Sequence, residues 1–132
     1  MANYIAGLKM SVFVMDYDHN APDPEHLEQT HEKFFRIIRE KNPDLPVIFV
    51  TKPDAPQDEN TVRRRNIVFD TYRRAWERGD RNVSFIDGNS LFEPEYHDIC
   101  TVDGCHPNDA GMVGMARVIG RELSRVLNGR LW

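Results

Sequence analysis

Ser-Val-Phe-Val-Met-Asp-Tyr-Asp-His-Asn, residues 11–20, is the stretch of sequence that decides the fold. Its first half is a short, continuous apolar run, which predicts a strand over residues 11–15 that is buried on both faces. Its second half is polar, and loops that directly follow such strands commonly carry functional side chains. We therefore expect a parallel strand here, with a ligand or catalytic site at its carboxyl end.

The same alternation of apolar runs and amphipathic segments continues along the rest of the chain. It predicts strands over residues 46–51 and 82–86 and helices over residues 24–41, 59–78 and from residue 107 onward, with residues 1–9 as the end of a helix. Strands that alternate with helices are typical of parallel sheets. The predicted fold class is α/β, a three-layer αβα arrangement with about three parallel strands.

Helical periodicity also predicts which faces are buried. The helix over residues 59–78 is expected to bury Val62, Val68 or Phe69, Tyr72 and Trp76. The last helix is expected to bury Val113, Ala116, Ile119, Leu123, Val126 and Leu127. The basic and ionisable residues of the two preceding helices are expected to lie in solvent, and these are Arg63, Arg64, Arg65, Arg73, Arg74, Arg78, His26 and His31.

Length and composition fit one domain over residues 1–132, with 40% apolar and 29% charged residues. The formal net charge of −4 and the pI near 5.7 provide no broad basic surface for nucleic acid. No stretch approaches the roughly 20 apolar residues of a membrane helix, and the N-terminus lacks the regions of a signal peptide. We therefore expect no nucleic-acid or membrane partner and assign no compartment. Cys100 and Cys105 are expected to be free thiols rather than a disulfide.

Three strands make a thin sheet, and only a short helical segment precedes the strand over residues 11–15. A strand that is buried on both faces normally has a neighbour on each side. Without that neighbour it presents an apolar edge that can pair with another chain. The sequence therefore predicts a domain that is truncated upstream and a homo-oligomer that forms through this edge.

The most informative polar segment is Asp-Gly-Cys-His-Pro-Asn, residues 103–108. Asp103, three residues before His106, can hold one imidazole nitrogen, which leaves the other free to act as general base and then general acid toward a hydroxyl nucleophile. The segment follows the last predicted strand and opens the last helix, where ligand sites of α/β domains gather. The alternative is a surface loop in which Asp103 caps the helix and His106 is merely exposed.

Asn20 is a second candidate, because its side-chain amide can donate a hydrogen bond to a developing oxyanion. One such donor is worth on the order of 3 kcal/mol in the transition state. The alternative is that Asp16, Asp18 and Asn20 only cap the helix that begins near Pro24 or hold a turn. We favour the functional interpretation because both polar segments converge on one face of the domain.

The stretch Val-Met-Asp-Tyr-Asp-His-Asn-Ala-Pro (residues 14–22) and the later segment 103–108 resemble the third and fifth sequence blocks of SGNH/GDSL hydrolases. The resemblance covers nearly the whole chain. It implies an incomplete flavodoxin-like αβα fold and a serine ester hydrolase without cofactor or metal. It implies a small-molecule ester as substrate, such as an acetyl or other short acyl ester on a carbohydrate or another small molecule. It also implies His106 as general base, Asp103 as its orienting acid and Asn20 as an oxyanion-hole donor.

The sequence departs from the family pattern in two ways. The usual Gly-x-Asn-Asp of the third block reads Asp-His-Asn-Ala over residues 18–21, and the block with the nucleophilic serine is absent. None of the serines present lies in the context of a nucleophile elbow, and these are Ser11, Ser84, Ser90 and Ser124. A general base without its nucleophile cannot carry out acyl transfer, so this chain alone is predicted to be inactive. We favour truncation over completion by another chain or loss of activity.

Three alternatives remain open. In the first, the chain is a Mg²⁺-dependent phosphatase similar to haloacid dehalogenases, with Asp16 as nucleophile and Asp18 as acid/base. In the second, a loop holds a divalent metal ion through His97, Asp98, Asp103 and His106. In the third, the chain is a non-catalytic fragment that self-associates.

Overall fold

The computed structural model describes residues 1–53 and 58–128. Three parallel strands form one sheet in the order β1-β2-β3. The strands are β1 (Phe13–Met15), β2 (Val47–Val50) and β3 (Val83–Ile86), and the long helices are α2 (Pro24–Lys41), α3 (Glu59–Glu77) and α4 (Asp109–Asn128). The short elements are α1 (Ala2–Ala6) and the 3₁₀ segments η1 (Gly88–Ser90) and η2 (Pro94–Ile99). The predicted α/β fold class and the three parallel strands are confirmed.

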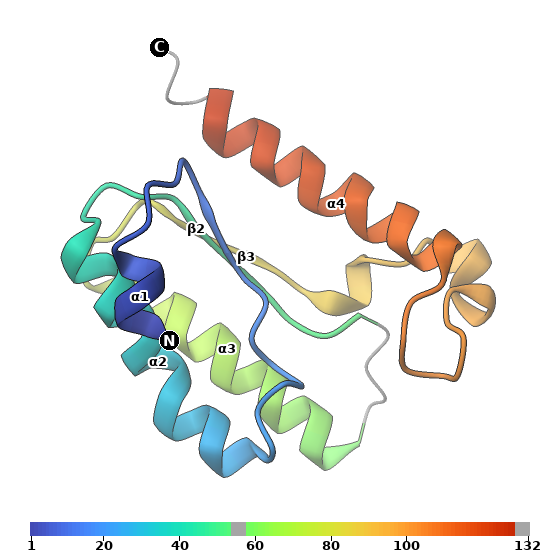
Figure 1. Cartoon of the computed structure of the whole chain (residues 1–132). Helices are drawn as coiled ribbons and strands as arrows, with labels where there is room; N and C mark the ends of the chain where they lie inside the picture. The colour runs from blue at the N-terminus through green and yellow to red at the C-terminus, as the bar shows by residue number, and fades with distance from the viewer. Residues whose placement is uncertain (54–57, 129–132) are drawn as a thin grey trace.

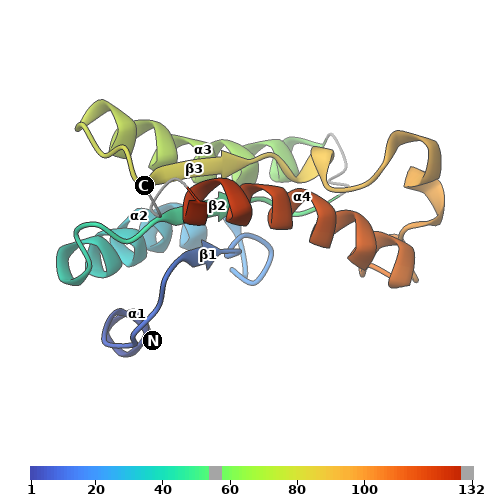
Figure 2. The same cartoon turned by 90° about the horizontal axis from the view of Figure 1, so that it is seen from above.

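The helices form two layers around the sheet. α2 and α3 cover one face, and α4 covers the other (Figure 1). The view from above shows the same arrangement, with α4 crossing over the strands (Figure 2). α2 and α3 share a face because right-handed crossovers that step in one direction across a parallel sheet place their helices on the same side. In the two described ranges, no helix combines the length and apolar character needed to cross a membrane.

β2 is the centre of the core, and all four of its side chains are buried. Val47 and Phe49 pack with the α2 and α3 layer, in contact with residues such as Leu27 and Val68. Ile48 and Val50 pack on the opposite side. There they meet one stripe of α4, which consists of Met115, Val118, Ile119, Leu123 and Val126. The apolar run over residues 46–51 therefore corresponds to a strand that is covered on both faces, as expected for a parallel sheet. The run over residues 11–15 was predicted to be buried on both faces, but in β1 only Met15 is buried, whereas Phe13 and Val14 are partly exposed, because β1 lies at the edge of the sheet.

The start of α2 is fixed by Asp23. Its side-chain oxygen accepts a hydrogen bond from the His26 N–H at 2.7 Å, and Pro24 lies in the first turn. Such a cap satisfies one of the unpaired N–H groups at a helix start and is typically worth about 1 kcal/mol. The sequence left open that Asp16, Asp18 or Asn20 caps this helix, but the side-chain cap is Asp23.

The buried face of α3 differs in part from the predicted one. Val68 is buried as expected, but Val62, Phe69 and Trp76 are exposed. α3 packs against α2 as well as against the sheet. The rings of Phe69 and Tyr72 pack on Phe85 of β3, and Trp76 packs on Tyr72. The residues that α3 buries are Thr61, Arg64, Val68, Thr71 and Ala75.

The predicted face of α4 is also wrong in part, because Val113, Ala116 and Leu127 are exposed. The residues of α4 that are most buried are Gly111 and Gly114. The helix is apolar around much of its circumference, so periodicity alone does not fix its orientation. The two glycines fix it, because only they can lie against the preceding segment.

His31 was expected in solvent, but its side chain is fully buried between α2 and α3. Its Nδ1 lies 2.8 Å from the Thr71 hydroxyl, and its ring stacks on Tyr17 with a centroid distance of 6.1 Å. Burial disfavours the charged imidazolium and lowers the pKa of His31 to about 4. His31 is therefore a neutral polar link inside the helical layer.

The low pKa makes His31 a source of acid sensitivity. The unfolded chain has the ordinary value of 6.5, so it binds the proton more readily than the folded protein, and stability is lost as the pH falls from 6.5 toward 4. Between pH 7 and pH 5 we expect His31 to account for about 2 kcal/mol of lost unfolding free energy.

His31→Gln should remove this part of the decrease in unfolding free energy between pH 7 and pH 5, which urea unfolding at the two pH values measures. His26→Gln, at an exposed position of the same helix, is the matched control. Equal pH dependence in wild type and His31→Gln would contradict the assignment.

Candidate active site

Residues 100–108 form a tight loop between η2 and α4. The Val102 N–H donates to the His106 carbonyl at 2.9 Å, which closes the base of the loop. Gly104 lies at the tip with a φ of 81°, a left-handed conformation that favours glycine. This turn brings the side chains of Asp103 and His106 into contact.

Asn108 joins this loop to α4. Its Oδ1 accepts a hydrogen bond from the Gly111 N–H at 3.1 Å, and its Nδ2 donates to the Ile99 carbonyl at 2.6 Å. Asn108 is thus the cap of a helix that begins at Asp109. Pro107 was predicted to lie in the first turn, but it precedes the helix.

The N-terminal half of α4 lies directly on the segment before the loop. A Cβ atom added at Gly111 would be 2.3 Å from the Cys100 carbonyl oxygen, and one added at Gly114 would be 2.6 Å from the Leu91 carbonyl oxygen. Neither distance is possible for a real side chain, so α4 can approach only because both residues are glycine. This contact holds the loop at the end of the sheet.

Asp103 and His106 form a close pair, as their spacing predicted. The Asp103 Oδ2 lies 2.7 Å from the His106 Nδ1. The other carboxylate oxygen, Oδ1, accepts hydrogen bonds from the backbone N–H groups of Cys105 at 2.9 Å and His106 at 2.8 Å. The carboxylate is therefore fixed in orientation before it meets the imidazole.

The same contacts determine the protonation of the pair. The backbone N–H of His106, then its side chain, then the backbone N–H of Cys105 lower the pKa of Asp103 to about 2. An ionised carboxylate can only accept hydrogen bonds, so the proton of the neutral imidazole lies on Nδ1. The His106 side chain is 77% exposed, and no residue in the described ranges makes a hydrogen bond to its Nε2. Nε2 is available to a substrate or a nucleophile.

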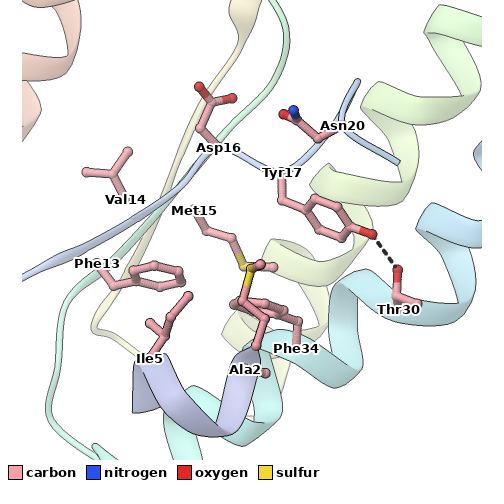
Figure 3. A pocket seen from close by; sticks show the side chains of 11 residues that line it. Ala2, Ile5, Phe13, Val14, Met15, Asp16, Tyr17, Asn20, Thr30 and Phe34 are labelled. Carbon is pink, nitrogen blue, oxygen red and sulfur yellow. Dashed lines mark hydrogen bonds between the residues drawn. The ribbon is translucent and has the colours of Figure 1, made fainter. Parts of the chain in front are cut away.

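Asn20 lies in a separate turn that directly follows β1. It is exposed and lines a cavity of about 680 Å³ together with side chains of α1, β1 and α2 (Figure 3). The cavity is mostly apolar, and its polar groups include the Tyr17 hydroxyl, which lies 3.0 Å from that of Thr30. Asp103 and His106 do not line this cavity.

The two parts of the candidate site lie beyond the carboxyl ends of the strands (Figure 1). Asn20 follows β1, whereas the loop with Asp103 and His106 lies past the end of β3 and η1. No hydrogen bond or ion pair between described residues joins them. The structure brings Asp103 and His106 together and leaves the oxyanion role of Asn20 a prediction.

Asp18 has a structural position. Its side chain is 3% exposed, its Oδ2 accepts a hydrogen bond from the Lys52 N–H at 3.0 Å, and its Oδ1 lies 3.2 Å from the His19 Nδ1. A carboxylate held in this way cannot reach a phosphate ester as acid/base. The Asp16 residue is solvent-accessible, but partial desolvation of its carboxyl group, then the charge of Asp18, raises its pKa. The phosphatase alternative needs both residues free, and this geometry does not support it.

The metal-site alternative is not supported by geometry either. His97 and Asp98 form one pair and Asp103 and His106 form another. Among residues 1–53 and 58–128, no three His, Cys, Asp or Glu side chains are arranged to hold a metal ion. The two cysteines are free thiols, with Cys100 buried and Cys105 exposed.

Arg64 was assigned to a solvated face, but it is buried. Its Nη1 donates to the carbonyl oxygens of Asp18 at 3.0 Å and Ala21 at 3.1 Å. The signal that could have found it is the spacing of the buried α3 residues, which places Arg64 in register with Thr61, Val68 and Thr71.

Comparisons with known proteins agree with this architecture. The solved structure of a protein from Bacteroides ovatus ATCC 8483, described as a GDSL-like lipase, has 25% identity and a TM-score of 0.82 and covers 96% of this chain. The salicylyl acyltransferase SsfX3 of a tetracycline biosynthetic pathway has 20% identity, a TM-score of 0.77 and 95% coverage. A family two carbohydrate esterase from Clostridium thermocellum, in complex with cellohexaose, has 17% identity, a TM-score of 0.67 and 89% coverage.

This chain spans only 39%, 40% and 36% of the lengths of these three proteins. No curated protein matches the sequence significantly. Residues 1–124, however, match the GDSL-like lipase/acylhydrolase family over nearly the whole chain. The resemblance found in the two sequence blocks is confirmed, and the chain belongs to the GDSL-like lipase/acylhydrolase family.

Proposed function

We propose that this chain carries the acid–base pair of a serine ester hydrolase, with His106 as general base, Asp103 as its orienting carboxylate and Asn20 as an oxyanion donor. The observation that carries the proposal is the 2.7 Å contact between Asp103 Oδ2 and His106 Nδ1. It leaves Nε2 open on the surface, at the end of a parallel sheet where ligand sites gather.

In the reaction, His106 Nε2 takes the proton from a hydroxyl nucleophile as that oxygen attacks the ester carbonyl. The carboxylate of Asp103 stabilises the imidazolium that forms, and Nε2 then returns the proton to the leaving alcohol. The ionised state of Asp103 suits this role, because a protonated carboxyl group would stabilise no charge.

We propose that the nucleophilic hydroxyl comes from a segment outside this chain. The Ser90 hydroxyl donates to the Asp87 carbonyl at 2.7 Å, and the other serines lie before β1, in β3 and in α4. In the part of the chain that is described, no serine hydroxyl bonds to His106. This chain alone is therefore expected to be inactive toward esters.

The proposed substrate is a short acyl ester, such as an acetyl group on a carbohydrate or other small alcohol. The fold is shared with a carbohydrate esterase in complex with cellohexaose, which supports a carbohydrate as the alcohol part.

The proposal predicts the behaviour of a fused protein in which residues 1–124 replace the matching 39% of the Bacteroides ovatus protein. We expect this protein to hydrolyse p-nitrophenyl acetate, and this chain alone to show no turnover that depends on His106. His106→Ala and Asp103→Asn should each lower kcat by a factor on the order of 10²–10⁴.

His97→Ala, at the neighbouring histidine, is the control and should leave turnover unchanged. Circular dichroism establishes that each fused protein is folded. A folded fusion whose turnover survives His106→Ala would refute the role of His106.

A second prediction concerns the titration of Asp103. Its carboxyl pKa of about 2 lies below the ordinary 3.8, so the bonds of the loop to the carboxylate are complete above pH 3.8 and are lost as the pH falls through 2. In His106→Ala the imidazole is lost but the backbone N–H donors remain. The pKa should therefore rise above 2 and stay below 3.8 in a ¹³C NMR titration. An unchanged pKa would mean that the two side chains are not in contact in solution.

The non-catalytic alternative retains one supporting observation. β1 is an edge strand of the sheet, and the apolar cavity with Ile5, Phe13 and Phe34 lies beside it (Figure 3). We propose that this edge mediates self-association of the chain. Light scattering should show a mass that rises with protein concentration, and a constant monomer mass would contradict the proposal.

A further inference from the structure

Arg64 is a buried cationic residue outside the Asp103–His106 pair, with 6% of its surface exposed. It projects from α3 toward the turn that contains Asn20. We propose that Arg64 is a positioning residue, which holds this turn in place and thereby sets the direction of the Asn20 side chain. The inference rests on the proposed function of Asn20 as an oxyanion donor.

Arg64 bonds the backbone on both sides of Asn20. Its Nη1 donates to the carbonyl oxygens of Asp18 and Ala21, at 3.0 and 3.1 Å. The same turn is closed by the Ala21 N–H, which donates to the Asp18 carbonyl at 3.1 Å. Asn20 lies between these two anchored residues and is itself exposed. One guanidinium therefore fixes the backbone on both sides of a free side chain.

The guanidinium is also fixed at its base. Its Nε donates to the Asn60 Oδ1 at 2.9 Å, one turn earlier on α3. A planar guanidinium with two of its nitrogens bonded has little freedom to rotate. Arg64 thus holds the turn at a fixed position relative to α3, and α3 is itself packed on the core through Val68 and Ala75.

A second anchor ties the turn to the sheet. The buried Asp18 carboxylate accepts a hydrogen bond from the Lys52 N–H, at the carboxyl end of β2. Within Asp18, Arg64 bonds the carbonyl oxygen and the Lys52 N–H bonds the carboxylate, so the two anchors use different atoms of the same residue. Together they locate the turn relative to both α3 and β2.

The energetic cost of this arrangement argues for a specific role. A buried charge is expensive unless it is fully hydrogen-bonded, and the other residues on this face of α3 are uncharged, namely Thr61, Val68, Thr71 and Ala75. An apolar side chain at position 64 could fill the same space on the buried face of α3. The carbonyl oxygens of Asp18 and Ala21 are buried, so water would have to enter the interior to solvate them. An arginine here supplies what neither gives, which is a fixed orientation of the turn.

Amide hydrogen exchange of the chain itself tests the inference without any need for activity. In Arg64→Met, the Ala21 and Lys52 amides should lose about tenfold of their protection beyond any change in the β2 amides of Val47–Val50. Arg64→Lys retains a charged donor but lacks the planar guanidinium, and should restore only part of that protection. Arg65→Met, which removes an ion pair to Asp87 from the same helix, is the matched control and should leave both amides unchanged.

The Asn20 side chain provides the readout that simple packing would not move. Its ¹⁵N relaxation should show a lower order parameter in Arg64→Met, with recovery in Arg64→Lys. If the two amides change only in step with the β2 amides, or if the Asn20 side chain is equally ordered in both variants, the positioning role is wrong.

The fused hydrolase separates this inference from the proposed function. There, Arg64→Met should lower kcat about tenfold with KM unchanged, and it should cause no further loss in an Asn20→Ala background. Loss of turn order without an effect of Asn20→Ala on turnover would support the positioning role and overturn the oxyanion role of Asn20.

Discussion

A strand that is buried on both faces must be covered by helices on both, and β2 imposes this requirement on the whole chain. Its parallel pairing with β1 and β3 needs two crossovers, which place α2 and α3 on one face. The other face is then left to α4 (Figure 2). To reach that face, the chain must leave β3 and turn back at the carboxyl end of the sheet. The loop with Asp103 and His106 is that return, so the position of the candidate site follows from the burial of one strand.

Backbone groups, more than burial, organise the contact between Asp103 and His106. Two N–H groups of a tight loop hold Asp103 and lower the pKa of its carboxyl group. A carboxylate oriented in this way remains ionised although it is open to solvent. It can therefore serve a neighbouring imidazole without the closed environment that many catalytic carboxylates require. The turn with Asn20 is also held by hydrogen bonds, to the carbonyl oxygens of Asp18 and Ala21 and to the Asp18 carboxylate, and Ala21 packs in the core as well.

The sequence predicts the elements well because their signals are local. Apolar runs mark the strands, and Asp103 and His106 are close enough in the chain for a loop to join them. It predicts the faces of α3 and α4 less well, because these depend on partners that are distant in the sequence. Phe69 and Trp76 are apolar yet lie at a sheet edge, whereas His31 and Arg64 are polar yet find partners inside. The orientation of α4 depends on the backbone clearance at Gly111 and Gly114, which no hydrophobic pattern records.

The order of the elements along the chain has a consequence for how the protein reaches its native state. The three strands and the two helices between them follow one another over residues 13–86, and each strand pairs with the strand that comes next in the sequence. Each pairing closes a loop that contains a whole helix, since Phe13 is paired with Val47 and Val47 with Val83, and parallel pairing of this kind is slow to form. α4 comes last and covers a face that the first five elements have already built. During synthesis on the ribosome, the loop with Asp103 and His106 therefore emerges together with the helix that covers the second face, and a chain interrupted before it would hold the three strands without the proposed general base.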